Sequence, residues 1–153
     1  MTRHLRSSRS LTVFRLLALL LLCLLLTSCG KSRFKPLYPV KGRVLVNGEP
    51  TADVTVQFHS LDDPGDQLVS PTAATDEDGW FTVSTYNAND GMPAGSYDVT
   101  MIWLMTDKRG RPKMGPLNKV NKLPMSYSKP ETSGFKVQIN KGENTLPPFE
   151  LHK

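Results

Sequence analysis

Cys29 is the residue whose surroundings point most clearly to chemistry, because its thiol follows a long apolar run and the small residues Thr27 and Ser28. The eleven residues 16–26 before them are leucine at nine positions. A positive segment precedes this run and carries Arg3, Arg6, Arg9 and Arg15. Such an apolar core has the length found in secretory signal peptides, and it is shorter than the roughly 20 residues that cross a bilayer. The pattern predicts a cleaved signal peptide with a helical core.

The segment Leu26-Thr27-Ser28-Cys29 resembles the lipobox of bacterial lipoproteins, in which the cysteine thiol is acylated and the chain is cut just before it. The resemblance implies cleavage between Ser28 and Cys29 and attachment to a membrane through lipid on Cys29. The diacylglycerol expected there supplies at least two acyl chains, which anchor firmly where a single chain is marginal. Gly30 follows the cysteine, in place of the aspartate that favours inner-membrane retention. We therefore expect a lipid-anchored protein of the cell envelope, at the outer membrane and facing the periplasm or the surface. The alternative is an ordinary secretory peptide cut nearby, with no role for Cys29.

Cleavage would change the charge and the cysteine count. The whole chain has 19 Lys+Arg and 14 Asp+Glu, a net charge of +5. Residues 1–28 hold four arginines and no acid, so 15 basic residues would face 14 acidic ones, a net charge of +1. This balance gives no indication of nucleic-acid binding. Cys23 would leave with the signal peptide and Cys29 would be acylated, so we expect no disulfide.

Downstream of the cysteine, residues 29–39 are short, basic and proline-containing, as expected of a tether. From residue 40 to residue 153 the sequence predicts one domain, in which short runs alternate apolar and polar residues between turn residues. The predicted strands are 40–46, 54–58, 72–75, 80–85, 97–105, 135–139 and 146–151. Asn47-Gly48 favours a two-residue hairpin turn, and Pro147 and Pro148 favour an edge position for the last strand. Seven such strands predict an all-β, antiparallel, Ig-like β-sandwich.

Residues 106–133 carry four prolines and show no periodicity. The sequence therefore predicts a long loop there, and no helix beyond the signal peptide. Loops of this length are uncommon in compact domains and are often functional.

Four motifs in order then resemble a known family. They are Val40-Lys41-Gly42-Arg43-Val44 with Asn47-Gly48-Glu49-Pro50, then Val54-Thr55-Val56-Gln57-Phe58, then Thr75-Asp76-Glu77-Asp78-Gly79-Trp80-Phe81, and finally Pro93-Ala94-Gly95-Ser96-Tyr97-Asp98-Val99. Over residues 38–151 the chain resembles bacterial lipoproteins with a carboxypeptidase-regulatory-like, or transthyretin-like, domain. The resemblance implies a seven-stranded, prealbumin-like accessory domain without catalytic activity.

A catalytic alternative would be the transthyretin-related hydrolases of ureide metabolism. Those enzymes need catalytic His and Arg residues and a Tyr-Arg-Gly-Ser terminus, whereas this chain ends in Phe149-Glu150-Leu151-His152-Lys153. The sequence also has no nucleophile elbow, phosphate-binding loop or His-Glu-x-x-His motif. We therefore expect no enzyme, no catalytic residues and no cofactor.

Three neighbouring acids, Asp76, Glu77 and Asp78, resemble the start of a calcium loop. An EF-hand also needs oxygen ligands at positions 5 and 12, and here those positions are Trp80 and Asn87. A turn is the better interpretation, although Asp62, Asp63 and Asp66 on another loop keep calcium binding open. His59 and His152 have no His or Cys at ligand spacing, so no metal site is expected.

Two features could make a binding surface. Trp80, Tyr86, Trp103 and Tyr127 could stack on a sugar ring. Trp103 shares a strand face with Tyr97, so core packing is the better interpretation for Trp103. Trp80 lies on the face of its strand opposite Phe81 and is expected to be exposed, so Trp80 and Tyr86 are the candidates for ligand contact. Residues 44–107 hold eleven acids and no Lys or Arg, while residues 108–153 hold ten Lys+Arg and three Glu. The asymmetry fits either an ordinary balanced surface or a bipolar one that orients the domain on a partner or on an anionic membrane.

The densest basic stretch is Lys108, Arg109, Arg111, Lys113, Lys119 and Lys122. It fits either a solvated loop or a contact with lipid headgroups or an acidic envelope polymer.

These observations predict a non-catalytic cell-envelope lipoprotein whose β-sandwich is a binding or structural module. Two other functions stay open: a carbohydrate-binding module for envelope polysaccharide, and an accessory subunit of an envelope protein complex.

Overall fold

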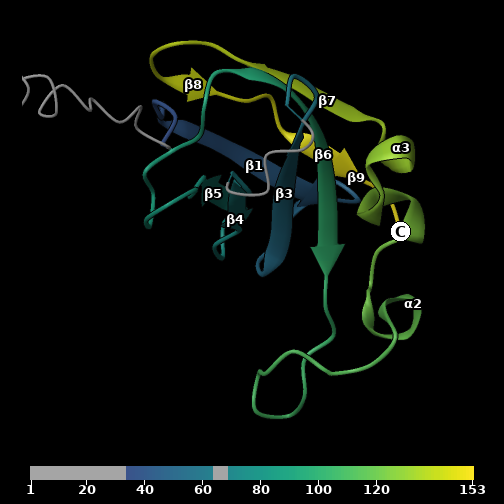
Figure 1. Ribbon diagram of the computed structural model, residues 1–153. Coiled ribbons are helices and arrows are strands. Elements are labelled where there is room, and N and C mark those ends of the chain that lie inside the picture. The colour runs from purple at the N-terminus through teal and green to yellow at the C-terminus, as the bar shows by residue number, and fades with distance from the viewer. Residues whose placement is uncertain (1–33, 64–68) are drawn as a thin grey trace, which may run out of the picture. The chain divides into compact units, whose positions relative to one another are not determined.

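The structure is a computed structural model that describes residues 34–63 and 69–153 (Figure 1). The predicted signal peptide, the cleavage site at Ser28 and the lipidation site at Cys29 lie outside the described residues. The chain divides into two compact units, and Lys35–Lys153 forms the second. This second unit is a sandwich of two β-sheets.

The first sheet is built around β1 (Val40–Val46). Its antiparallel partners are β2 (Glu49–Pro50) and β5 (Trp80–Thr82). Two strands from the end of the chain, β8 (Asn144–Thr145) and β9 (Phe149–Leu151), run parallel to β1.

The second sheet is fully antiparallel and has the order β4-β3-β6-β7. Its strands are β3 (Val54–Ser60), β4 (Thr72–Ala74), β6 (Gly95–Trp103) and β7 (Phe135–Ile139). The long strand β6 lies at its centre, with Val54 of β3 opposite Trp103.

The core lies between the sheets and follows the alternation in the sequence. Val54, Val56 and Phe58 of β3 are all at most 2% exposed, while their neighbours on the strand face outward. Such burial of one face of each sheet is the main favourable term for a sandwich. Gly42 of β1 fits the same scheme, because a Cβ there would come within 2.4 Å of the Phe81 ring.

The fold class is the predicted one, an all-β sandwich, but the strands differ in number and direction. The described residues form nine strands rather than seven, because β2 and β8 add two-residue pairings. The pairing of β8 and β9 with β1 is parallel, whereas the sequence predicted antiparallel strands throughout. Strand direction depends on where the preceding loop returns the chain, which alternation alone does not encode. The Asn47-Gly48 hairpin turn is confirmed, with positive φ at both residues and Val46 opposite Glu49.

The long loop prediction for residues 106–133 is corrected, because this segment contains three short helices. They are α2 (Leu117–Val120), the 3₁₀ helix η1 (Met125–Ser128) and α3 (Pro130–Ser133). Each has four residues, roughly one turn, and is too short to show a helical period in sequence. Prolines at 116, 124 and 130 stand at or next to their starts, where the missing N–H costs nothing.

The sandwich has two distinct ends, set by the direction of β6. Tyr38 pairs with Met92 just before β6 begins, so the chain enters the domain at what we call the tether end. At the other end of β6 the chain leaves Trp103 into residues 104–122, which we call the arm (Figure 1). We call this second end the arm end.

Candidate functional site

A groove of about 460 Å³ runs along the edge of the sandwich between β4 and β5. Its aromatic wall is Trp80, which is 43% exposed as the sequence predicted. The polar side chains that line the groove are Thr55, Thr72, Asp76, Thr82, Ser84 and Asn89. An exposed indole beside hydroxyl, amide and carboxylate groups can stack on an apolar ring face and hydrogen-bond to its polar edge.

The turn before β5 fixes the position of Trp80. Oδ1 of Asp76 accepts hydrogen bonds from the backbone N–H groups of Asp78 and Trp80, at 3.0 and 2.8 Å. The guanidinium carbon of Arg43, on the neighbouring strand β1, lies 5.4 Å from the centre of the indole ring. Arg43 is itself held by a 3.0 Å bond from its Nε to the carbonyl of Asp78. This cation–π contact engages the indole and restricts its motion.

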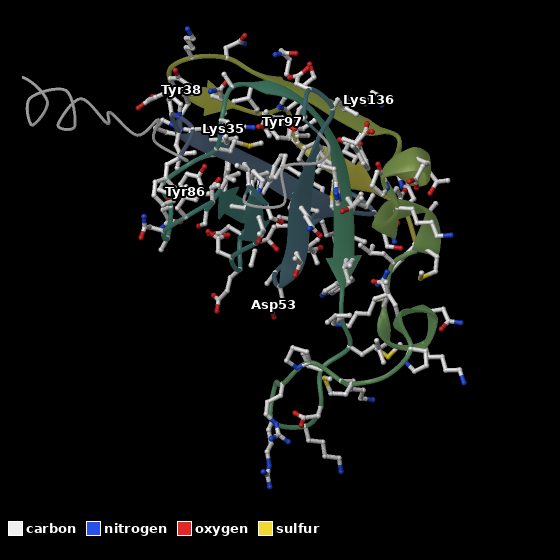
Figure 2. The ribbon with its side chains drawn as sticks, in the orientation of Figure 1. Lys35, Tyr38, Asp53, Tyr86, Tyr97 and Lys136 are labelled. Carbon is white, nitrogen blue, oxygen red and sulfur yellow. The ribbon has the colours of Figure 1, made fainter. Side chains whose placement is uncertain are left out.

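The other aromatic candidates do not join Trp80. Tyr86 does not line the groove and lies instead at the tether end, where its Oη accepts a 3.1 Å hydrogen bond from the N–H of Lys35 (Figure 2). Trp103 is half-buried at the arm end, with the ammonium groups of Lys122 and Lys153 4.1 and 4.9 Å from its ring centre. Tyr127 stacks on Phe135 and packs against the core. Among the described residues, Trp80 is therefore the one exposed aromatic side chain of the groove, because Phe81, which also lines it, is 3% exposed.

Three of the acids considered as calcium ligands are engaged by the protein's own groups. Asp76 accepts the two backbone bonds just described, Asp62 accepts the N–H of Ser96 at 2.8 Å, and Asp63 pairs with Lys35 at 3.0 Å. No three His, Cys, Asp or Glu side chains gather as a metal site within residues 34–63 and 69–153. Asp66 lies outside these ranges. The same ranges contain no helix with the length and apolar character of a membrane span.

A polar cluster that the sequence did not reveal lies on the outer face of the second sheet. Nε2 of His59 is 2.8 Å from Oγ1 of Thr100, which is 3% exposed. Beside them Asp98 of β6 forms an ion pair with Lys136 of β7. Burial lowers the pKa of His59 below its ordinary value, against the opposing influence of Asp98 and Glu131. The cluster joins β3, β6 and β7. Its residues are far apart in the sequence, and only the pairing of these strands brings them together.

The arm is an ordered hairpin-like projection. Backbone pairing of Leu104 with Asn121 and of Thr106 with Pro112 holds its two sides together. At its tip Asp107 accepts the N–H groups of Arg109 and Arg111 and two bonds from the Arg111 guanidinium. These bonds, chiefly those from Arg111, lower the pKa of Asp107 below its ordinary value. The six residues of the predicted basic stretch thus lie on one projecting element.

No family model and no curated protein matches this chain. Solved structures with some likeness include a DUF3823 family protein from Parabacteroides merdae, 17% identical, with 77% of this chain and 47% of that chain covered and a TM-score of 0.39. The major pilin subunit of Bacillus cereus is 13% identical, with 72% and 29% covered and a TM-score of 0.38. A 9R-lipoxygenase from Cyanothece PCC8801 is 12% identical, with 95% and 24% covered and a TM-score of 0.39. The chain spans less than half of each of these proteins, and a likeness of this extent says nothing of function.

Proposed function

We propose that the protein is a non-catalytic lipoprotein of the cell envelope, whose β-sandwich is a binding module anchored through lipid on Cys29. The observation that carries the proposal is the order of features in the first 40 residues: positive segment, apolar core, small residues and cysteine, followed closely by the sandwich. The family resemblance of residues 38–151 to lipoprotein domains supports the same function.

The geometry of the domain agrees with such an anchor. Lys35, the first residue of the compact unit, is six positions after Cys29, and an extended chain over six positions reaches about 20 Å. Lys35 and Tyr38 are both tied to the tether end. The nine residues of β6 span about 30 Å from there to the arm end. A lipid on Cys29 would thus attach the tether end and leave the arm end accessible to a partner.

The direct test is Cys29→Ala in the full chain, with Cys23→Ala as the matched control. We expect Cys29→Ala to abolish incorporation of labelled fatty acid and to move the protein from the membrane to the soluble fraction. Cys23→Ala changes the other cysteine of the chain, which lies in the apolar core, and is expected to leave both properties unchanged. A Cys29→Ala protein that still carried the label would refute the assignment.

Carbohydrate binding in the groove between β4 and β5 is a second candidate function. One observation favours it: the exposed, oriented indole of Trp80 beside hydroxyl and amide side chains. Stacking of a sugar ring on such an indole uses an apolar surface that is otherwise left in water.

The test is retention of the protein on immobilised envelope polysaccharide. We expect Trp80→Ala to lose retention and Trp80→Phe to keep part of it, because a smaller aromatic face remains. Leu61→Ala is the control, since Leu61 is similarly exposed, at 46%, and lies outside the groove. Retention that is unchanged in Trp80→Ala would exclude the groove as the site.

A further inference from the structure

We propose that the arm end pairs with a second copy of this chain, the basic arm of each copy resting on the acidic turns of the other. The proposal does not depend on lipid at Cys29. It rests on charges that are exposed, unpaired and complementary on the same end of one domain.

The basic half of this surface is the arm. Lys108, Arg109, Lys113 and Lys119 are exposed, and within the described part of the chain their side chains form no ion pair. Only Arg111 has an acidic partner, Asp107 of the same turn. Met114 between these cations is 96% exposed and adds an apolar group to the arm. Exposed cations fixed on an ordered projection favour an anionic partner.

The acidic half is formed by two segments that connect the sheets, residues 47–53 between β1 and β3 and residues 76–79 between β4 and β5, which we call the acidic turns. Oγ1 of Thr75 donates to the carbonyl of Thr51 at 2.7 Å, and the N–H of Val44 donates to the carbonyl of Gly79 at 2.9 Å. The first bond links the acidic turns through Thr75, the residue before Asp76, and the second joins Gly79 to strand β1. The exposed acids on them without an ion pair in the described residues are Glu49, Asp53, Glu77 and Asp78.

Both halves lie at the arm end. Asp53 immediately precedes Val54, which pairs with Trp103 where the arm begins. Figure 2 shows Asp53 at this end of the sandwich, away from Lys35 and Tyr38. The N–H of Asp53 donates to the carbonyl of Thr75, which places the second turn beside it.

The arm does not neutralise the acidic turns of its own chain. Its base is fixed by Asn121, whose Oδ1 accepts the N–H groups of Trp103 and Leu123, at 2.9 and 3.2 Å. Figure 1 shows the arm extending away from the sheets rather than folding back on them. Complementary patches that cannot meet within one chain can meet in a two-fold dimer, where each contact occurs twice.

The charge balance favours a second copy over an anionic polymer. A polymer-binding domain usually carries an excess of basic residues, because affinity comes from neutralising many like charges. Without residues 1–28 this chain has 15 basic and 14 acidic residues, and a polymer on the arm would also meet the acidic turns. A second copy uses both patches.

The experiment is a charge swap measured by sedimentation equilibrium on the full chain in a density-matched non-ionic detergent, whichever cell fraction the protein is purified from. Variant A is Lys108→Glu, Arg109→Glu and Lys113→Glu. Variant B is Glu49→Lys, Glu77→Lys and Asp78→Lys, which spares the capping residue Asp76 and the positive-φ residue Asp53. The control variant is Lys41→Glu, Lys129→Glu and Lys141→Glu. It changes the net charge by as much as variant A does, at positions away from the arm and the acidic turns. Thermal unfolding of each variant verifies that it is folded.

We expect the native chain to dimerise at low salt, with a dissociation constant that rises at least about tenfold from 0.05 to 0.5 M NaCl because salt screens exposed charges. Variants A and B are each expected to be monomeric, the control to dimerise, and an equal mixture of A and B to form mixed dimers. A native chain that is monomeric at low salt would overturn the proposal, as would folded variants that remain dimeric or fail to pair in the mixture. Retention of the monomeric native chain, but not variant A, on immobilised polyglutamate would assign the arm to an anionic polymer instead. Failure here leaves the Cys29→Ala result untouched, so the two proposals fail separately.

Discussion

Single residues in this sandwich are determined by the side chains that pack against them. Gly42 is the clearest case, because the ring of Phe81 occupies the space in which any larger residue would place its Cβ. Phe81 in turn stacks on Phe149 with ring centres 6.1 Å apart. The glycine thus allows aromatic residues from β5 and β9 to pack over β1.

Gly42→Ala is expected to destabilise the fold by about 1–3 kcal/mol, the usual cost of overpacking a core. The new methyl carbon would lie 2.4 Å from Cζ of Phe81, so the ring or the strand has to move. The free energy of unfolding in urea measures the effect. Lys41→Ala, an exposed neighbour on β1, should change it by less than about 0.5 kcal/mol. Equal stability of both variants would show that the ring relaxes freely.

His59 makes stability depend on pH. Its pKa in the folded protein is below the ordinary value of 6.5, chiefly because burial disfavours the charged ring. As pH falls through 6.5 the unfolded chain therefore binds a proton that the folded chain does not, and the folded state loses stability.

We expect the free energy of unfolding to decrease from pH 7.5 to pH 5.5, and His59→Gln to reduce this decrease. Glutamine keeps a polar group near Thr100 and does not titrate. His152→Gln is the control, because His152 is exposed at the chain end. The same pH dependence in His59→Gln as in the native protein would contradict the assignment.

At the scale of elements, the local sequence pattern predicts the strands, whereas tertiary contacts determine the structure of the arm. Alternation fixed which face of β1 and β3 is buried, because a strand places successive side chains on opposite faces. Strand β6 is the exception, since both of its faces are buried from Tyr97 to Met101. The arm has no such period. It is held by isolated backbone bridges and by Asn121, which is 9% exposed and has no hydrogen-bond acceptor for its Nδ2 among the described groups.

Asn121→Ala is expected to loosen the arm, because two buried or half-buried backbone donors, of Trp103 and Leu123, lose their acceptor. The expected loss of stability is about 1–3 kcal/mol. Hydrogen exchange should accelerate in residues 104–123 and change little in β3. Asn118→Ala, an exposed position on α2, is the control. Unchanged exchange at Trp103 and Leu123 would mean that the backbone pairing alone holds the arm.

At the scale of the whole molecule, the sandwich contains its own core. Among the described residues, the members of the hydrophobic core all lie between Val40 and Leu151. The described residues contain no cysteine, so packing and hydrogen bonds hold this unit together without a disulfide.

A chain that begins at Lys35 is therefore expected to fold in one cooperative transition, with the same unfolding midpoint as the longer protein. Circular dichroism during thermal unfolding of both proteins measures this. A second truncation beginning at Arg43 serves as the comparison, because it removes the first three residues of β1, including Val40 and the bonds of Tyr38 to Met92. A midpoint lowered already in the chain that begins at Lys35 would show that earlier residues stabilise the sandwich.

The sequence by itself determined the local features, because alternation, Asn-Gly turns and proline positions act between neighbouring residues. It thereby predicted the all-β fold, the buried faces of β1 and β3, and the exposure of Trp80. Only the tertiary structure decided the parallel pairing of β8 and β9, the separation of Trp80 from Tyr86, and the meeting of the basic arm and the acidic turns at one end. These depend on loop closure between residues far apart in the chain, whose energy is gained only when the whole sandwich has formed.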